Sequence, residues 1–139
     1  MDKKLLMIDD DAGIARVVSV GLIARELGME FRAITSPLIA NEVFAAYRPD
    51  IVIIDMAEKD GIEVLSKILA TGVPTKVVLT SGFGDVYLRL GIGVTKFHGI
   101  EGVPLLKKPF RRAELIELLN MTLQVCPANR HEWGPQPYR

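Results

Sequence analysis

Acidic residues gather at two points of the sequence, and each group follows a short apolar run. Asp9 and Asp10 come directly after residues 5–8 (LLMI), and Asp55 comes directly after residues 51–54 (IVII). Carboxylates that lie close together repel one another unless a cation lies between them. Oxygen ligands in a small pocket suit Mg²⁺, and a carboxylate beside such an ion can act as a nucleophile and form an acyl phosphate. These residue types therefore favour a magnesium site with phosphoryl chemistry.

A hydroxyl and an ammonium group complete this set. Thr80 follows a third apolar run at residues 77–79 (VVL), and Lys108 stands just before Pro109. Hydroxyl and ammonium groups can donate hydrogen bonds to phosphoryl oxygens. In an open parallel α/β sheet, ligands bind at the carboxyl ends of the strands. We therefore expect the acidic residues, Thr80 and Lys108 to converge on one crevice.

The elements that must position these residues can be read from the hydrophobic pattern. The three apolar runs lack alternation, which is typical of central strands buried on both faces of a parallel sheet. Two weaker strands are predicted near residues 30–34 and 103–107. With helical segments between the strands, the β-α unit repeats five times. Right-handed crossovers then predict an α/β fold with a doubly wound, five-stranded parallel sheet and helices on both faces.

The helical segments are recognised by their periodicity and by the residues at their ends. In the first, Ile14, Val17, Val18 and Leu22 share one face. The second is expected to begin at Ser36-Pro37, because serine is a good N-cap and proline suits the first helical position. The helices are predicted from residue 14 to near Gly28, from Ser36-Pro37 to Pro49, from Ile62 to near Gly72, over residues 85–98 and over residues 113–125.

Length, charge and cysteine usage narrow the class of protein. A chain of 139 residues suits one domain, and a formal net charge of zero leaves no electrostatic footprint for nucleic acid or an anionic membrane. The apolar run near the N-terminus is too short for a signal-peptide core or a membrane span. Cys126 is the single cysteine, so we expect a reducing compartment and a cytoplasmic protein.

Residues 126–139 contain three prolines and no apolar period, and we expect a flexible tail or the start of a linker after a domain at residues 1–125.

The order of these motifs resembles the receiver domains of response regulators in two-component signalling. The matching features are Asp9-Asp10, Asp55, Thr80 and Lys108-Pro109-Phe110, and the phrase PDIVIIDMAEKDGIEVL at residues 49–65 is the closest local match. The resemblance covers about residues 3–125. It implies a flavodoxin-like fold with the strand order 2-1-3-4-5.

The resemblance also implies a role for each site residue. Asp55 would be the phosphoacceptor. Asp10, Asp55 and the carbonyl of Ala57 would be ligands of Mg²⁺, with Asp9 in its outer shell. Thr80 and Lys108, from the other two strand ends, would hold the phosphoryl group.

As a receiver, the protein would be a signalling switch that catalyses its own phosphorylation and dephosphorylation, not a turnover enzyme. The implied partners are a sensor histidine kinase or phosphotransfer protein and an output domain or partner protein. A homodimer is compatible with the family, whereas nucleic acid and membrane are not expected to bind this domain.

Three features depart from the family pattern. The loop after Asp55 is shorter and lacks the common proline, and the stretch between Thr80 and Lys108 is longer, chiefly around residues 91–102. Leu105 stands where the family often has an aromatic residue. Residues 81–110 are similar to receivers fused to EAL-type cyclic-di-GMP phosphodiesterases. We therefore expect the signal to leave the site through residues 81–102, where glycines lower the cost of backbone rearrangement.

Simpler and rival interpretations remain open at this point. Asp9 and Asp55 could be ordinary helix caps, and Lys108 could be a surface lysine, since Lys107, Arg111 and Arg112 surround it. A haloacid-dehalogenase-type phosphohydrolase would use Asp9-x-Asp11, a hydroxyl and a later lysine, but it would place further acids after that lysine. A receiver-like scaffold that binds a partner without phosphorylation is the third alternative.

Overall fold

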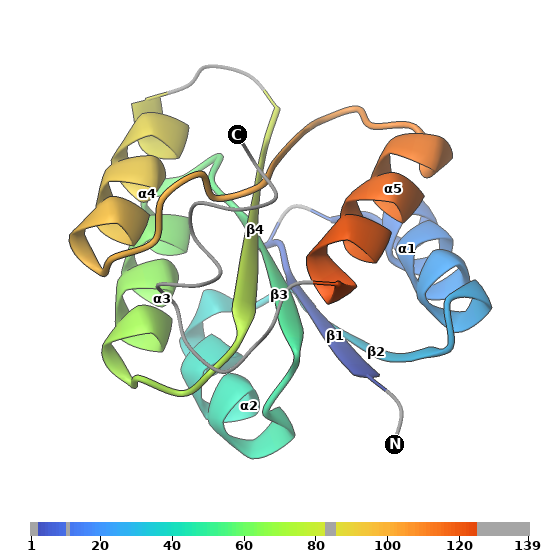
Figure 1. The fold of residues 1–139 in the computed structure, drawn as a ribbon, viewed down its shortest axis with the longest axis horizontal. Helices are drawn as coiled ribbons and strands as arrows, with labels where there is room; N and C mark the ends of the chain where they lie inside the picture. Colours follow the sequence, from blue (N-terminus) through green and yellow to red (C-terminus); the bar gives the residue numbers. More distant parts are fainter. Residues whose placement is uncertain (1–2, 11, 83–85, 125–139) are drawn as a thin grey trace.

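The fold is a single parallel sheet covered by helices on both faces (Figure 1). The computed structural model describes residues 3–10, 12–82 and 86–124. All neighbouring strands pair in parallel, and their order is β2-β1-β3-β4-β5. This confirms the predicted α/β fold and the flavodoxin-like strand order. The strands are β1 (Lys3–Ile8), β2 (Met29–Ile34), β3 (Ile51–Asp55), β4 (Lys76–Ser81) and β5 (Leu105–Lys107).

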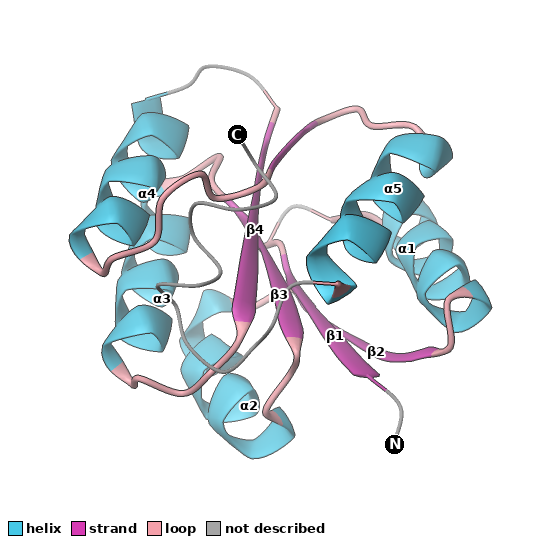
Figure 2. Ribbon diagram, in the orientation of Figure 1, coloured by secondary structure: helices cyan, strands magenta, loops and turns pink. Residues whose placement is uncertain are grey.

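The helices form two layers (Figures 1 and 2). One layer holds α1 and α5 on one face of the sheet, and the other holds α2, α3 and α4. Among the described helices, none is both long enough and apolar enough to cross a membrane. The helices are α1 (Ile14–Glu26), α2 (Ala40–Tyr47), α3 (Lys59–Ala70), α4 (Val86–Phe97) and α5 (Arg112–Leu123), and a 3₁₀ turn (Pro37–Ile39) precedes α2.

The interiors of the central strands are apolar because each face of the sheet has its own core. In β1, Leu5 and Met7 belong to the core under α1 and α5. Leu6 and Ile8 belong to the core under α2, α3 and α4. Successive side chains of a strand point to opposite faces, so a strand covered on both sides needs no polar residue in its interior. The unalternating runs that predicted these strands are therefore explained.

Helix α1 packs through a different face from the one that its apolar pattern suggested. Of the four residues of the predicted stripe, Val17 packs against the core, whereas the side chains of Ile14, Val18 and Leu22 are exposed. A β-carbon on Gly21 would lie 3.1 Å from the Phe31 ring, so this glycine permits a close approach of α1 to β2. The residues that α1 buries are Val20, Ile23 and Ala24.

The second helix begins later than predicted. Ser36 precedes the 3₁₀ turn without a capping hydrogen bond from its side chain, and α2 itself begins at Ala40. The proline after Ser36 fits the first position of that tighter turn. Ser36-Pro37 therefore marks the start of a helical segment, as predicted, but the first turn of that segment is a 3₁₀ turn and not α-helical.

Candidate functional site

The predicted site residues lie at one edge of the sheet, where strands end. Asp9 directly follows β1, and Asp55 is the last residue of β3. Thr80 pairs with Asp55 in the β3–β4 register. Lys108 follows β5, and its backbone N–H donates to the carbonyl of Ser81 at 2.7 Å. The convergence expected from the sequence is therefore present.

Three carboxylates form a compact cluster at this edge. One oxygen each from Asp9, Asp10 and Asp55 lie within 4.8 Å of one another. Asp9 and Asp55 are buried, whereas Asp10 is exposed. Ala57, the fourth predicted ligand, lies two residues beyond Asp55 in an exposed loop. The cluster thus reaches from the interior of the sheet to the surface.

Two cationic side chains offset the repulsion within this cluster. Lys108 Nζ lies 2.8 Å from Asp55 Oδ1 and 3.0 Å from Asp9 Oδ2. Arg16 Nη1 lies 3.1 Å from the same oxygen of Asp9. Lys107 is exposed and belongs to a different hollow of the surface. The structure thus brings Lys108 to the carboxylates, as the sequence indicated.

The two oxygens of Asp55 have different surroundings. Oδ1 faces Lys108 and lies 3.4 Å from the hydroxyl of Thr80, a long hydrogen bond. Oδ2 is buried and accepts no hydrogen bond from the part of the chain that the structure describes. A buried carboxylate oxygen without a partner is costly, which points to a ligand that would complete its coordination.

Burial and charge act on the pKa of Asp55 in opposite directions. Burial raises the pKa most strongly, and the charge of Asp9 raises it further. The hydrogen bond and charge of Lys108 and the backbone amide of Ala57 lower it. The net effect is a pKa above the ordinary value of an aspartate. A cation close to Oδ2 would oppose this shift by stabilising the ionised form.

The helix-cap alternative for these acids does not hold in the structure. The N-cap of α1 is Gly13, so neither Asp9 nor Asp10 caps that helix. The N-cap of α3 is Glu58, three residues beyond Asp55. The acidic residues at the strand ends are therefore available for a site.

A small divalent cation fits the donors at this edge. All three side-chain donors are carboxylate oxygens, and one of them, Oδ2 of Asp55, lacks a described partner. A pocket of about 10 Å³ opens beside Asp10, Asp55 and Asp60, close to the space that one water molecule needs. Hard oxygen ligands and little room suit Mg²⁺.

Sequence reasoning missed several residues of the site. Arg16 pairs with Asp9, and a β-carbon on Gly61 would lie 2.2 Å from the backbone oxygen of Asp55. Glu58 and Asp60 form a second acidic set with Asp10, within 4.8 Å of one another. The position of Arg16 in the first turn of the helix after β1 was the available signal. Gly61 lies in the first turn of α3, and a glycine directly after Asp60 was the available signal.

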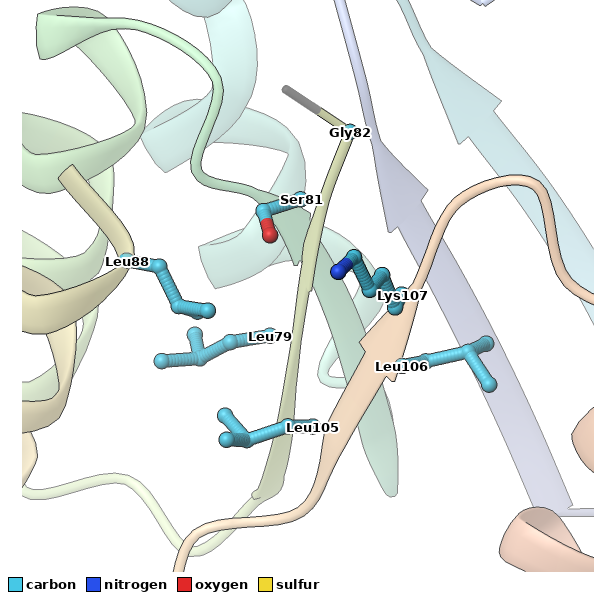
Figure 3. Close-up of a pocket in the computed structure, with 7 residues that line it drawn as sticks. All are labelled: Leu79, Ser81, Gly82, Leu88, Leu105, Leu106 and Lys107. Carbon is cyan, nitrogen blue, oxygen red and sulfur yellow. The ribbon is translucent and has the colours of Figure 1, made fainter. Parts of the chain in front are cut away.

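One departure from the family pattern, Leu105, lies beside the site (Figure 3). A hollow of about 580 Å³ separates β4 and β5 from the start of α4. Leu105 lies on the same side of β5 as Leu79 and Leu88, while Leu106 points to the opposite side. Leu105 is 46% exposed, so this side chain only partly fills the space where the family often has an aromatic ring.

Comparison with known proteins gives a family-level match. The model of the response regulator receiver domain matches residues 5–120. The chain is 35% identical over 82 residues to a protein-glutamate methylesterase/protein-glutamine glutaminase of Shewanella denitrificans, covering 57% of this chain and 23% of that protein. It is 28% identical over 85 residues to the regulatory protein AtoC of Escherichia coli, covering 60% of this chain and 18% of that protein. The chain thus spans about a quarter or less of these relatives.

Solved structures agree with this match at the level of the fold. The chemotaxis protein CheY4 of Vibrio cholerae superposes with a TM-score of 0.70 at 19% identity, covering 86% of this chain and 98% of that chain. A response regulator from Thermotoga maritima also gives a TM-score of 0.70 at 19% identity, covering 86% of this chain and 96% of that chain.

Proposed function

The chain belongs to the family of response regulator receiver domains, and from this premise we propose that it is a phosphorylation switch with Asp55 as the phosphoacceptor. The observation that carries the proposal is the environment of Asp55. Its buried carboxylate lies beside Asp9 and Asp10, pairs with Lys108 through Oδ1 and has no described hydrogen-bond partner at Oδ2. Asp55 is thus a carboxylate held in place by one oxygen, with a second oxygen left for chemistry.

Asp55 accepts the phosphoryl group by nucleophilic attack. A carboxylate oxygen of Asp55 forms a bond to phosphorus while the phosphorus–nitrogen bond of a phosphohistidine donor breaks. The electron pair of that bond returns to the donor ring, which leaves as neutral imidazole because its other nitrogen carries the proton. The product is an acyl phosphate. Lys108 and Thr80 then donate to phosphoryl oxygens, since both already lie beside Asp55.

Asp10, Asp55 and the carbonyl of Ala57 would hold Mg²⁺, with Asp9 in its outer shell. When bound, this ion would neutralise charge on the carboxylates and on the phosphoryl oxygens. The small pocket beside Asp10 and Asp55 and the carboxylate oxygens around it support this assignment. The residues of the chain provide the nucleophile, its orientation and the hydrogen-bond donors.

The biological partners follow from this chemistry. We assign residues 1–125 to the receiver, while the tail or linker predicted at residues 126–139 lies outside the described residues. The phosphodonor would be a sensor histidine kinase or phosphotransfer protein. The phosphorylated receiver would regulate an output domain or partner protein in the cytoplasm, and a homodimer is one form in which it would do so. The methylesterase activity named for one relative is not part of this proposal, because the match covers 23% of that protein.

The test is the intact mass of the protein after incubation with acetyl phosphate and Mg²⁺. We expect one added phosphoryl group on the parent chain and none on Asp55→Asn, because an amide cannot form the acyl phosphate. Glu117→Gln is the matched control, since it removes one acidic charge from an exposed position of α5 and leaves Asp55 in place.

Other results would favour the rival functions. Labelling of Asp55→Asn, or labelling at Asp9, would contradict the assignment. Sustained turnover of small phosphomonoesters would favour a phosphohydrolase of the haloacid-dehalogenase type. Absence of labelling in the parent chain would favour a scaffold that does not use phosphorylation.

A further inference from the structure

Asp9 accepts contacts from both cationic side chains of the site through one oxygen. Its Oδ2 lies 3.0 Å from Lys108 Nζ and 3.1 Å from Arg16 Nη1. The two cations are held differently. Lys108 also pairs with Asp55, and its side chain is 10% exposed, whereas the side chain of Arg16 is 35% exposed. Lys108 is therefore enclosed between two carboxylates, and Arg16 reaches Asp9 from the partly exposed first turn of α1.

The charges at this edge determine how strongly a divalent cation is attracted. Asp9, Asp10 and Asp55 supply negative charge here, and Glu58 and Asp60 add more beside Asp10. Loss of Arg16 would leave this edge one charge more negative and so more attractive to a divalent ion. A guanidinium group bonded to Asp9 also repels a cation held by the neighbouring carboxylates, because charges a few ångströms apart interact strongly where water is partly excluded.

We propose that Arg16 competes with the hydrated divalent cation for Asp9, in the outer shell of the site, and thereby sets the metal affinity of the site. This inference rests on the magnesium site of the proposed function. In the metal-free protein Arg16 is a positioning residue, because it stabilises the buried Asp9 carboxylate close to its neighbours. When the metal binds, the guanidinium leaves Asp9 for solvent. A long side chain that is already partly exposed can make this movement without disturbing α1.

The decisive measurement is titration calorimetry of Mg²⁺ with the parent chain, Arg16→Gln, Arg16→Met and Arg16→Lys. We expect Arg16→Gln and Arg16→Met to lower the Kd on the order of tenfold at low ionic strength, with a smaller difference at high salt. Arg16→Lys keeps the charge and should stay within about threefold of the parent. Arg25→Gln is the matched control, because it removes the same charge from the exposed last turn of the same helix, and it should leave the Kd almost unchanged.

Thermal stability gives a second readout, because the substitution should affect the metal-free and the metal-bound protein differently. In EDTA, Arg16→Gln should melt below the parent, because Asp9 loses a partner. Saturating Mg²⁺ should raise its melting temperature by more than it raises that of the parent. An unchanged or weaker Mg²⁺ affinity in both Arg16→Gln and Arg16→Met would overturn the competition while leaving the magnesium site intact. Absence of Mg²⁺ binding by the parent would instead overturn the proposed metal site and this inference together.

Discussion

Asp55 combines burial with a cationic partner, and both matter for its reactivity. Burial raises its pKa, so the metal-free protein disfavours the ionised form that a nucleophile needs. Lys108 opposes this effect at 2.8 Å and keeps one oxygen oriented. A cation at the remaining oxygen would shift the balance to the carboxylate. In the proposed switch, a bound cation would therefore favour the ionised form of Asp55 that acts as the nucleophile.

The raised pKa predicts that Asp55 destabilises the metal-free fold, and that this destabilisation increases with pH. A carboxyl group whose pKa is higher in the folded state than in the unfolded state contributes its full stability below the unfolded pKa, about 3.9. That contribution is lost as the pH rises through the folded pKa. Asp55→Asn does not titrate, so its free energy of unfolding in EDTA should exceed that of the parent by about 1 kcal/mol near neutral pH. The difference should shrink toward pH 4.

Urea unfolding at a series of pH values from 4 to 8 checks this prediction. Asp60→Asn removes the same charge from an exposed position, so its gain in the free energy of unfolding should be smaller. The comparison separates the effect of burial from the effect of charge. A gain for Asp55→Asn that did not depend on pH would show that the buried carboxyl is not its source.

Thr80 is expected to transmit the phosphorylated state and not to create it. Its hydroxyl lies 3.4 Å from Asp55 Oδ1, and a phosphoryl group would offer it a better acceptor. Thr80→Ala should still be labelled by acetyl phosphate, while the change in hydrogen exchange on phosphorylation becomes smaller, because a ligand shifts an equilibrium only by its differential contacts. Thr80→Ser keeps the hydroxyl and should respond like the parent. Complete loss of labelling in Thr80→Ala would assign this residue to the chemical step.

At the scale of single elements, α4 contains two residues that disfavour a helix. It carries Gly91 and Gly93, and glycine in a helix interior costs about 1 kcal/mol relative to alanine. The structure gives the two glycines different reasons to be there. A β-carbon on Gly91 would lie 2.8 Å from the sulfur of Met56 and 3.3 Å from a methyl carbon of Leu79, whereas one on Gly93 would meet nothing within 4 Å. Gly91 therefore allows α4 to approach the sheet next to the site.

These two glycines give a matched pair of substitutions with opposite expected signs. Gly91→Ala should lower the free energy of unfolding by about 1–3 kcal/mol, because overpacking against Met56 outweighs the gain in helix propensity. Gly93→Ala should raise it by up to about 1 kcal/mol. Chemical denaturation of both variants measures the difference. Equal effects of the two substitutions would show that the close packing at Gly91 does not matter.

The short loop between β3 and α3 also depends on a glycine. Asp55 ends β3 and α3 begins at Lys59, so only three residues connect them. Gly61 passes so close to the backbone oxygen of Asp55 that a β-carbon there would lie 2.2 Å from it. This close approach couples the start of α3 to the position of the Asp55 backbone.

At the scale of the whole molecule, the two ends of the sheet are built differently. The site edge holds clustered charges with room for a ligand. Toward the other end, Lys76 opens β4 with a buried side chain whose Nζ donates to the carbonyl of Thr122 at 2.7 Å. That bond joins the beginning of β4 to the last turn of α5 through buried groups. We therefore expect a structural change at Asp55 to be resisted toward Lys76, where a buried hydrogen bond would have to break. We expect it to be accommodated around the hollow beside Leu105.

This asymmetry supports the prediction that the signal leaves through residues 81–102. Leu105 cannot swing an aromatic ring into space vacated by Thr80, and the hollow of about 580 Å³ beside it leaves room for the start of α4 to move. Beryllofluoride with Mg²⁺, a mimic of the phosphoryl group, should change hydrogen exchange within residues 81–102 and leave the segment of α5 beside Lys76 nearly unchanged. Leu105→Ala should mainly loosen packing. If exchange changed only at residues 103–110, the route would run through β5 instead.

Local patterns in the sequence were enough to predict the α/β class of the fold and the positions of the site residues at strand ends, whereas the strand order followed from the family resemblance. The runs at residues 5–8, 51–54 and 77–79 indicated central strands because a strand buried on both faces has no polar alternation. Polar residues at their ends indicated the functional edge, since the ends of parallel strands meet there. Both signals lie within a few consecutive residues, so they can be read without knowing what packs against them. The chemical roles assigned to Asp55, Thr80 and Lys108 remain predictions that the experiments above address.

Only the tertiary structure decided which groups face one another across long separations in the sequence. Lys108 and Asp9 are 99 residues apart in sequence, yet they form an ion pair, and no periodicity carries that information. The contact of Arg16 with Asp9 depends on how α1 is rotated about its axis. The close approach at Gly21 accommodates this rotation, although Ile14, Val18 and Leu22 formed an equally apolar stripe. Packing is a property of two surfaces at once, and one segment of sequence specifies only one of them.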